Sequence, residues 1–179
     1  MKGTILVCLR EMLTDTKGVS AADWREMTAA AGLAPEKGVI TAFSDVEDSI
    51  AVGIFGQAQQ RFFNSHIELA DAFGHFWCVT YAPRVYPSTC NRFSNARDFI
   101  AGMDAVHVMV TQSIKNSSPP RFTYESIGSN RLRVHYQSKR GLIHIFAGLC
   151  RGVGAYFGEQ MKVEVLSDTA LEIEFGAKT

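Results

Sequence analysis

The main change in the spacing of the apolar residues along the chain occurs at the Ser-Ser-Pro-Pro run of residues 117–120. Before this run they recur every three to four positions, as in helices, and after it they alternate with polar residues, as in strands. Two hairpins are expected there, RFTYESI with RLRVHYQS around GSN, and QMKVEVL with ALEIEF around SDT. The segment GLIHIFAGLCRGVGAYF between them is expected to be a helix. This order predicts an α+β fold, with a helical N-terminal part followed by an antiparallel sheet of about four strands with an inserted helix.

The helices expected before the proline run have recognisable ends. Ser20 is expected to cap a helix that stops at Gly32, and Ser44 or Asp45 to cap another that ends close to residue 60. Ser94 is expected to cap a long helix that ends close to residue 115. The segment APRVYPSTCN, with two prolines, is expected to be an irregular connection. Helices are also expected over residues 4–16 and 65–82, the second with an apolar face of Leu69, Phe73, Phe76, Trp77 and Thr80.

The composition excludes several classes of protein. The 179 residues hold 18 basic and 18 acidic side chains, whereas a nucleic-acid-binding protein usually has a basic excess. No apolar run approaches the length of a membrane-spanning helix. The N-terminal segment MKGTILVCLREML has charges inside its apolar part and does not resemble a signal peptide. We therefore expect a cytoplasmic protein without a membrane span or a nucleic-acid partner, with its four scattered cysteines reduced.

His107 is the histidine with the most informative surroundings. On a helix, its face is shared with Ile100, Met103, Val110 and Ile114, so its imidazole is expected to be buried or half-buried. One interpretation is a core histidine bonded to a backbone carbonyl. The other is a ligand of a metal or of haem, because neutral imidazole is the commonest metal ligand and an apolar wall suits haem. No HxH or HExxH pattern supplies further ligands for a non-haem metal.

A second group of polar residues, Tyr136, Ser138 and Arg140, alternates at the end of a predicted strand, so that all three are expected to project to one side. A phenol, a hydroxyl and a guanidinium on one face suit a carboxylate, because each supplies hydrogen-bond donors. The alternative is a solvated strand face. Haem is an apolar disc with a central iron and two carboxylates at one edge. An imidazole on an apolar helix, followed by three carboxylate-binding side chains, fits haem better than most other ligands.

With these residues in place, the sequence resembles the haem nitric oxide/oxygen-binding (H-NOX) domain family, which includes the sensor domain of soluble guanylate cyclase. The matching stretches are MKGTI, FIAGMDAVH, SSPPRF, YQSKR as the family's Y-x-S-x-R motif, and AGL. A histidine 29 residues before the tyrosine, with Pro-Pro between them, makes the match specific. The resemblance covers essentially the whole chain. It implies a single domain over residues 1–179, with a helical subdomain over residues 1–62, a haem-ligating and sheet subdomain over residues 63–179, and the haem buried between them.

The resemblance also implies which residues contact one haem b per chain. His107 is the expected iron ligand, and Tyr136, Ser138 and Arg140 are expected to hold the propionates. Pro120 is expected to press on the haem and to help distort it. Further neighbours of the haem or of its gas-binding side are expected to be Met103, Ile5, Trp77, Ile145 and Leu149. Some members hold zinc near the C-terminus; none is expected here, because neither cysteine nor histidine follows Cys150.

Residue 145 indicates which gas is bound. Oxygen-binding members carry a tyrosine five residues after the motif arginine, and its hydroxyl donates to bound oxygen; here that residue is Ile145. Nitric oxide and carbon monoxide need such a donor far less, and a hydrogen bond of about 1–3 kcal/mol changes affinity roughly five- to 150-fold. The resemblance therefore implies a nitric oxide sensor that also binds carbon monoxide and discriminates against oxygen. The indole N–H of Trp77 is an alternative donor, although aromatic packing is the preferred interpretation.

The implied mechanism is a switch, so an enzyme is not expected. Nitric oxide weakens the bond between iron and His107, the helix relaxes, and the surface offered to a partner changes. No output domain is expected within these 179 residues, so the resemblance implies a separate partner: a histidine kinase, a cyclic-dinucleotide enzyme or a chemotaxis receptor. Two other hypotheses stay open. One is a haem enzyme that consumes nitric oxide or peroxide, which usually recruits a polar acid–base group beside the haem. The other is a haem-free interaction domain that has kept the fold.

Overall fold

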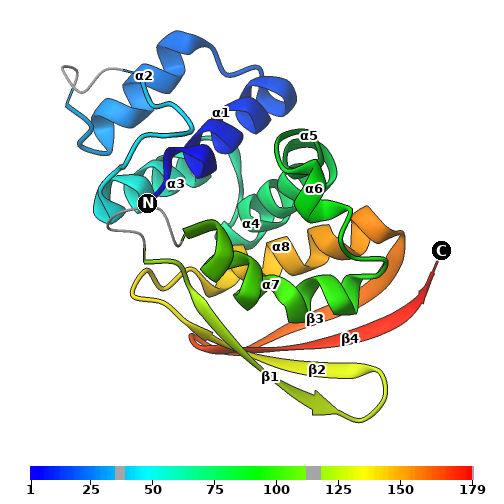
Figure 1. Cartoon of the computed structure of the whole chain (residues 1–179). Coiled ribbons are helices and arrows are strands. Elements are labelled where there is room, and N and C mark those ends of the chain that lie inside the picture. Colours follow the sequence, from blue (N-terminus) through cyan, green and yellow to red (C-terminus); the bar gives the residue numbers. More distant parts are fainter. Residues whose placement is uncertain (35–38, 112–117, 179) are drawn as a thin grey trace. The chain divides into compact units, whose positions relative to one another are not determined.

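The structure is a computed structural model of the chain, and it describes residues 1–34, 39–111 and 118–178. The chain divides into two compact units, Met1–Leu69 and Ala70–Thr179, which are described separately (Figure 1). The division falls within a helix, α4 (His66–His75). None of the described helices combines the length and the apolar character needed to cross a membrane.

The first unit is helical and holds α1 (Gly3–Lys17), α2 (Ala21–Ala30), α3 (Asp48–Phe62) and the start of α4. Its predicted cap at Ser20 is confirmed: the Asp23 N–H donates to Ser20 Oγ at 3.2 Å, and the Ser20 N–H donates to Asp23 Oδ2 at 2.9 Å. One face of α1 is fully buried and contributes Leu6, Leu9, Met12 and Leu13 to this unit's core.

The expected cap of α3 at Ser44 or Asp45 is wrong. Glu47 occupies the cap position. Ser44 Oγ instead accepts from the Thr41 N–H at 3.0 Å, and Asp45 forms an isolated β-bridge and an ion pair with Lys2. Because the side chains of Ser44 and Asp45 bond to Thr41 and Lys2, they are not available to cap α3, and the helix begins only after this turn.

The second unit opens with a helical run that the sequence predicts only in part. The rest of α4 is followed by a π-helical turn, η2 (Phe76–Tyr81), and then by α5 (Ala82–Val85). A π turn is wider than an α turn, and here Tyr81 is buried, whereas Thr80, expected on the apolar face, is exposed. The connection expected to be irregular is helical too, because α6 (Pro87–Cys90) follows directly with proline at its first position, where no N–H is needed.

The sheet of the second unit confirms the predicted α+β class. Strands β1 (Arg121–Ile127), β2 (Arg131–Gln137), β3 (Glu159–Ser167) and β4 (Ala170–Lys178) pair antiparallel in the order β1-β2-β4-β3. The inserted helix is α8 (Ile143–Phe157), and α7 (Ala96–Thr111) precedes the sheet. Both hairpin turns lie where the sequence places them.

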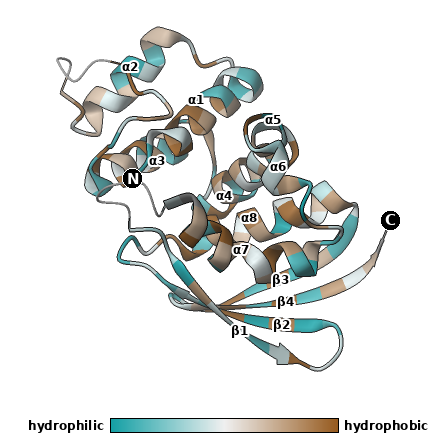
Figure 2. Ribbon diagram, in the orientation of Figure 1, coloured by the Kyte–Doolittle hydropathy of each residue, from teal (hydrophilic) through white to brown (hydrophobic). Residues whose placement is uncertain are grey.

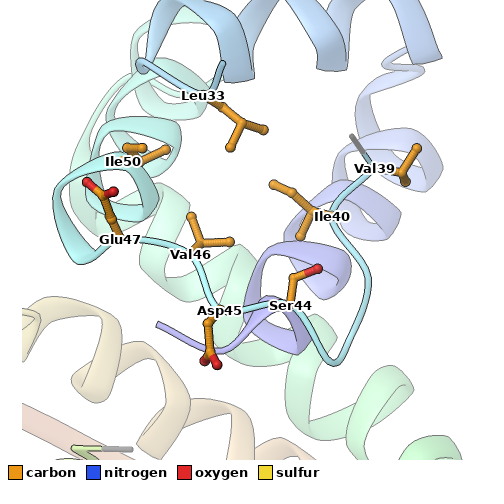
Figure 3. Close-up of a pocket in the computed structure, with 8 residues that line it drawn as sticks. All are labelled: Leu33, Val39, Ile40, Ser44, Asp45, Val46, Glu47 and Ile50. Carbon is orange, nitrogen blue, oxygen red and sulfur yellow. The ribbon is translucent and has the colours of Figure 1, made fainter. Parts of the chain in front are cut away.

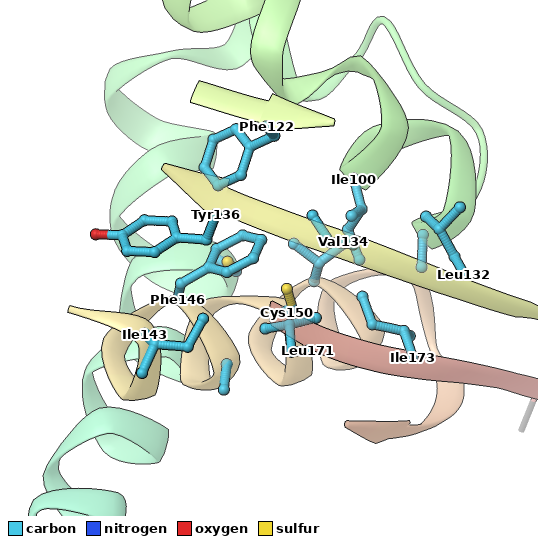
Figure 4. Close-up of a cluster of buried hydrophobic side chains, with 14 residues drawn as sticks. Ile100, Phe122, Leu132, Val134, Tyr136, Ile143, Phe146, Cys150, Leu171 and Ile173 are labelled. Atoms are coloured by element: carbon cyan, nitrogen blue, oxygen red, sulfur yellow. The ribbon is translucent and has the colours of Figure 1, made fainter. Parts of the chain in front are cut away.

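The core of this unit lies between one face of the sheet and the helices. The register pairs Phe122 with Tyr136 and Val134 with Leu171, so these side chains share the buried face and pack with Phe146 of α8 (Figure 4). The opposite face is polar. It carries ion pairs from Arg131 to Glu172 at 3.0 Å and from Arg133 to Glu172 at 3.1 Å. Figure 2 shows the contrast between hydrophobic residues on α7 and α8 and hydrophilic residues along β1 and β2.

Within the second unit α8 and α4 meet backbone to backbone through glycines. A Cβ on Gly148 would lie 2.0 Å from the carbonyl oxygen of Ala70, and a Cβ on Gly152 would lie 2.1 Å from that of Gly74. The close approach extends to η2, where the Cys78 thiol donates to the Leu149 carbonyl oxygen at 3.5 Å. Only glycine permits this contact, which places the π turn beside α8.

Candidate functional site

Helix α7 carries His107 and is fastened at its N-terminal end. The Asn95 side-chain oxygen accepts from the Asp98 N–H at 2.8 Å, so Asn95, and not the expected Ser94, caps the helix. The Ala96 N–H points to both carboxylate oxygens of Glu159, each at 3.4 Å. A negative charge at this end is favourable because of the helix dipole. The predicted C-terminal end near residue 115 and the side chain of Ile114 lie outside the described residues.

Asp104 fastens the same helix one turn before His107. Its Oδ1 and Oδ2 accept from Nε and Nη2 of Arg121, both at 2.8 Å, and Oδ1 also accepts from the Phe122 N–H at 2.9 Å. The bonds from Arg121 and then from Phe122 lower the pKa of Asp104 to about 2. The carboxylate is therefore charged at neutral pH and ties α7 to the start of β1.

The imidazole of His107 is half-buried beside this anchor. Its Nδ1 is buried without a hydrogen-bond partner, and its ring centre lies 5.5 Å from that of Phe122. Burial lowers the pKa of His107, while the charge of Asp104 and the Pro120 carbonyl act in the opposite direction. The net effect favours the neutral imidazole, whose free electron pair is the form that binds a metal.

Aromatic rings extend from His107 across the sheet. The ring centre of Phe122 lies 5.9 Å from that of Tyr136 and 4.7 Å from that of Phe146. The rings of Tyr136 and Phe146 stack with their centres 5.6 Å apart and their planes at 13°. Figure 4 shows these three rings together, with the Tyr136 hydroxyl pointing away from the apolar cluster. The expected iron ligand and the first residue of the motif thus share one aromatic layer.

The other two motif residues lie beyond the strand. β2 ends at Gln137, so Ser138 and Arg140 belong to a turn, and the expectation that strand alternation aligns all three side chains is wrong. Ser138 Oγ accepts from the Arg140 N–H at 3.2 Å, and Arg140 Nη1 donates to the Ser118 carbonyl oxygen at 2.8 Å. The turn therefore holds the segment that leads into Pro120.

The remaining predicted site residues fall into two groups. Trp77, Met103 and Leu149 pack against the same buried cluster as Phe122 and Tyr136. Ile145 lies half-buried on α8, and Ile5 lies half-buried on α1 in the first unit. The second unit alone therefore supplies His107, the motif, Pro120 and four of the five other predicted contacts.

A separate cavity of about 400 Å³ lies wholly within the first unit (Figure 3). Aliphatic side chains form most of its wall, with Ser44, Asp45 and Glu47 along one side. The complete lining is Leu33, Val39, Ile40, Ser44, Asp45, Val46, Glu47 and Ile50. It contains none of the predicted site residues.

The residues around His107 suit haem better than a bare metal ion. Across the part of the chain that the structure describes, no three His, Cys, Asp or Glu side chains are grouped to hold a metal. A single neutral imidazole with an unpartnered nitrogen, beside a layer of aromatic rings, matches a cofactor that brings its own four ligands. The guanidinium of Arg140 and the hydroxyls of Tyr136 and Ser138 add donors suited to carboxylates.

Comparison with known proteins decides the family. The family model described as haem-NO-binding matches residues 2–165. The chain belongs to this family. The fold that the resemblance implied is therefore confirmed, and the chain is an H-NOX domain. No protein with curated annotation was found to match it.

Solved H-NOX structures share its fold. A variant of an H-NOX protein from S. oneidensis in the Fe(II) ligation state is 21% identical, with a TM-score of 0.87 over 100% of this chain and 98% of that one. A variant from T. tengcongensis is 24% identical, with a TM-score of 0.78 over 100% of both chains. An oxygen-binding H-NOX domain related to soluble guanylate cyclases, in its oxygen complex, is 24% identical, with a TM-score of 0.76 over 99% and 96%.

Several residues that position the site are not predicted from the sequence. Asp104, Phe122, Phe146 and Glu159 were not singled out, although an aspartate one turn before His107 and an arginine directly after Pro120 form a visible pair of charges. Glu159 has no such signal, because it meets α7 from 63 residues away in the sequence.

Proposed function

We propose that this H-NOX domain senses nitric oxide through a ferrous haem b bound by His107 and signals to a separate protein. The observation that carries the proposal is the neutral, half-buried imidazole with an unpartnered ring nitrogen, in a chain that belongs to the haem-NO-binding family. Bound haem would supply an iron with one position left for a diatomic gas.

Each predicted site residue has a role in this proposal. His107 would supply the protein ligand to the iron, and Tyr136, Ser138 and Arg140 would hold the propionates by charge-assisted hydrogen bonds. Pro120 would contact the haem, because its segment is held by Arg140 and lies beside His107. Met103, Trp77 and Leu149 line the cofactor together with Ile145 and Ile5.

The choice of gas rests on residue 145. The Ile145 side chain is aliphatic and offers no hydrogen-bond donor, so it cannot stabilise the negative charge that develops on bound oxygen. Nitric oxide and carbon monoxide need no such donor. We therefore propose that oxygen is rejected while nitric oxide and carbon monoxide bind.

The signal would travel through α7. The helix is held at Asp104 and at its N-terminal end, and a bond from His107 to iron would add a third restraint. Release of His107 would remove one restraint and would let the C-terminal part of α7 move relative to the sheet. A cytoplasmic histidine kinase, cyclic-dinucleotide enzyme or chemotaxis receptor would read the change, and no step requires turnover.

One optical titration tests this function. Haem-loaded, dithionite-free ferrous protein is exposed in turn to air, carbon monoxide and nitric oxide, and the Soret band is recorded. We expect stable shifts with nitric oxide and carbon monoxide, and only slow oxidation in air. A stable, reversible complex in air would contradict the role of Ile145.

The two other hypotheses have their own outcomes. Sustained consumption of nitric oxide with excess reductant would favour a haem enzyme, whereas uptake of one equivalent supports the sensor. Protein that takes up no haem when haem is supplied would favour an interaction domain without cofactor.

A further inference from the structure

One surface of the second unit combines exposed apolar and cationic side chains. Val85, Tyr86 and Met109 are 40%, 38% and 47% exposed, and Arg84 and Arg92 are exposed beside them. We call these five residues the Arg–Tyr–Met surface. Tyrosine, arginine and methionine are the residue types enriched where proteins bind one another, and lysine, aspartate and glutamate are depleted there.

Contacts connect Tyr86, Arg92 and Met109, and Arg84 and Val85 directly precede Tyr86 in the chain. The Tyr86 carbonyl oxygen accepts from the Thr89 and Cys90 N–H groups at 3.0 and 3.1 Å, and the Arg92 N–H donates to the Thr89 carbonyl at 3.3 Å. Residues 84–92 are thus a compact pair of turns. Arg92 Nη1 then reaches the Met109 sulfur at 3.6 Å, which connects these turns to α7 (α5, α6 and α7 in Figure 1).

The charge of this surface has one sign. Its charged members are Arg84 and Arg92, and residues 72–97, which contain both, include no aspartate or glutamate. The zero net charge of the chain also conceals two unlike halves. Residues 1–69 hold six basic and nine acidic side chains, whereas residues 70–179 hold twelve basic and nine acidic ones, so the second unit carries +3. A complementary partner surface is acidic with apolar residues between its carboxylates.

The surface is also linked to the haem site. Met109 follows His107 by two residues on the same helix, and it contacts Arg92, which belongs to the neighbouring turns. Movement of the C-terminal part of α7 therefore changes where Met109 lies relative to Arg92. A partner that contacts both residues would distinguish the two positions of the helix.

We propose that the Arg–Tyr–Met surface docks an acidic, apolar segment of the signalling partner, and that its affinity changes when His107 leaves the iron. The second half of this statement rests on the function proposed above. The docking itself is a property of the surface and holds for the ferrous protein alone.

A peptide titration tests the docking. The probe is a fluorescein-labelled peptide of about five helical turns, with leucines on one face and glutamates on the other, and its control replaces every glutamate by glutamine. With haem-loaded ferrous protein, fluorescence anisotropy is expected to show about tenfold tighter binding of the acidic peptide, and the difference is expected to shrink with added salt.

Matched variants locate the binding. The double variant Arg84→Gln with Arg92→Gln is expected to abolish the preference for the acidic peptide. Tyr86→Ser is expected to weaken binding by about fivefold. The double variant Arg84→Lys with Arg92→Lys is expected to retain most of the preference for the acidic peptide. Arg25→Gln, on the exposed side of α2, and Leu166→Ser, on β3, are expected to change nothing. Circular dichroism confirms that each variant is folded.

Three results would overturn the proposal. One is equal binding of the acidic and the glutamine peptide. A second is an equal loss of affinity in the Arg25→Gln control. The third is tighter binding of phosphatidylserine vesicles or a single-stranded oligonucleotide than of the peptide, which would assign the surface to a membrane or to nucleic acid.

The link to the haem is tested on nitric oxide-treated protein. We expect the affinity for the acidic peptide to change by about threefold or more in the natural sequence and to stay constant in Met109→Ser. Unchanged affinity in the natural sequence would refute the link. If the Soret band shows that nitric oxide does not bind, the proposed function fails, while the ferrous titration still decides the docking.

Discussion

Asp104 lies one turn before His107 and fixes that turn of α7 against the sheet. Its carboxylate takes three hydrogen bonds, two from Arg121 and one from the Phe122 N–H, although Arg121 itself is more than half exposed. Surface ion pairs usually contribute little, but bidentate geometry and a backbone donor are the arrangement in which they contribute most.

We expect Asp104→Asn to lower the free energy of unfolding by about 1–3 kcal/mol, because an amide cannot replace the charge-assisted pair. Urea unfolding of haem-loaded protein at neutral pH measures the change. Asp168→Asn, in an exposed turn, is the control and is expected to be neutral. Equal stability of the two variants would contradict the anchoring role.

Acid pH is expected to weaken the same contact. The pKa of Asp104 is lowered from 3.8 to about 2 by Arg121 and then by the Phe122 N–H, so the carboxylate stabilises the fold at pH values above 3.8 and loses this effect as pH falls toward 2. The difference in unfolding free energy between the natural sequence and Asp104→Asn should therefore shrink over that range. A constant difference would refute the assignment.

The contribution of the buried thiols to stability is expected to be lost at alkaline pH, whereas that of Asp104 is lost at acid pH. All four cysteines are free and buried, and burial raises the pKa of both Cys78 and Cys150, with smaller contributions from Cys90 to the first and from Cys78 to the second. The folded state keeps these protons where the unfolded state loses them, so this stability is present below pH 9 and is lost above it. Burial also raises the pKa of Tyr124 to about 12, which adds to the loss at higher pH.

Two measurements check the thiols. Urea unfolding is expected to give a lower free energy at pH 10 than at pH 8, with a smaller decline in Cys150→Ala. A disulfide reagent such as DTNB is expected to label the folded protein slowly and the denatured protein at four sites. Rapid labelling of the folded protein would show that the thiols are accessible.

At the scale of elements, the contact between α4 and α8 depends on glycine. A Cβ on Gly148 would meet backbone atoms of Ala70 and Asp71, which cannot turn aside as a flexible side chain can. We expect Gly148→Ala to lower the free energy of unfolding by about 1–3 kcal/mol or more. Gly56→Ala in α3, where a Cβ would meet open space, is the control and is expected to raise it by about 0.5–1 kcal/mol. Similar effects of both changes would refute the close packing.

The pattern of residues within a segment predicts its secondary structure well only where local preferences outweigh packing against the rest of the chain. The strands, the inserted helix and the Ser20 cap follow from alternation and capping chemistry. The π turn at residues 76–81 does not follow from these local signals, because packing against α8 determines it. Ser44 and Ser94 fail as caps for the same kind of reason: the side chain of Ser44 bonds elsewhere, and Asn95 offers a better-placed oxygen than its neighbour.

At the scale of the whole molecule, the sequence predicts the fold class and the identity of the candidate site, but not how the site is held. The motif residues are recognisable as a pattern, yet Ser138 and Arg140 act from a turn and not from a strand. The sheet order β1-β2-β4-β3 and the contact of Glu159 with α7 join segments that are distant in the sequence, and such contacts leave no local signal.

Resonance Raman spectroscopy of His107→Gly, compared with the natural sequence, tests most directly the claim that one histidine on α7 holds the haem iron and releases it to signal. The ferrous natural protein is expected to show an iron–histidine stretching band that disappears with nitric oxide. The variant is expected to lack this band and to regain it with added imidazole. A variant that keeps the band without imidazole would contradict the account, because another residue would then be the iron ligand.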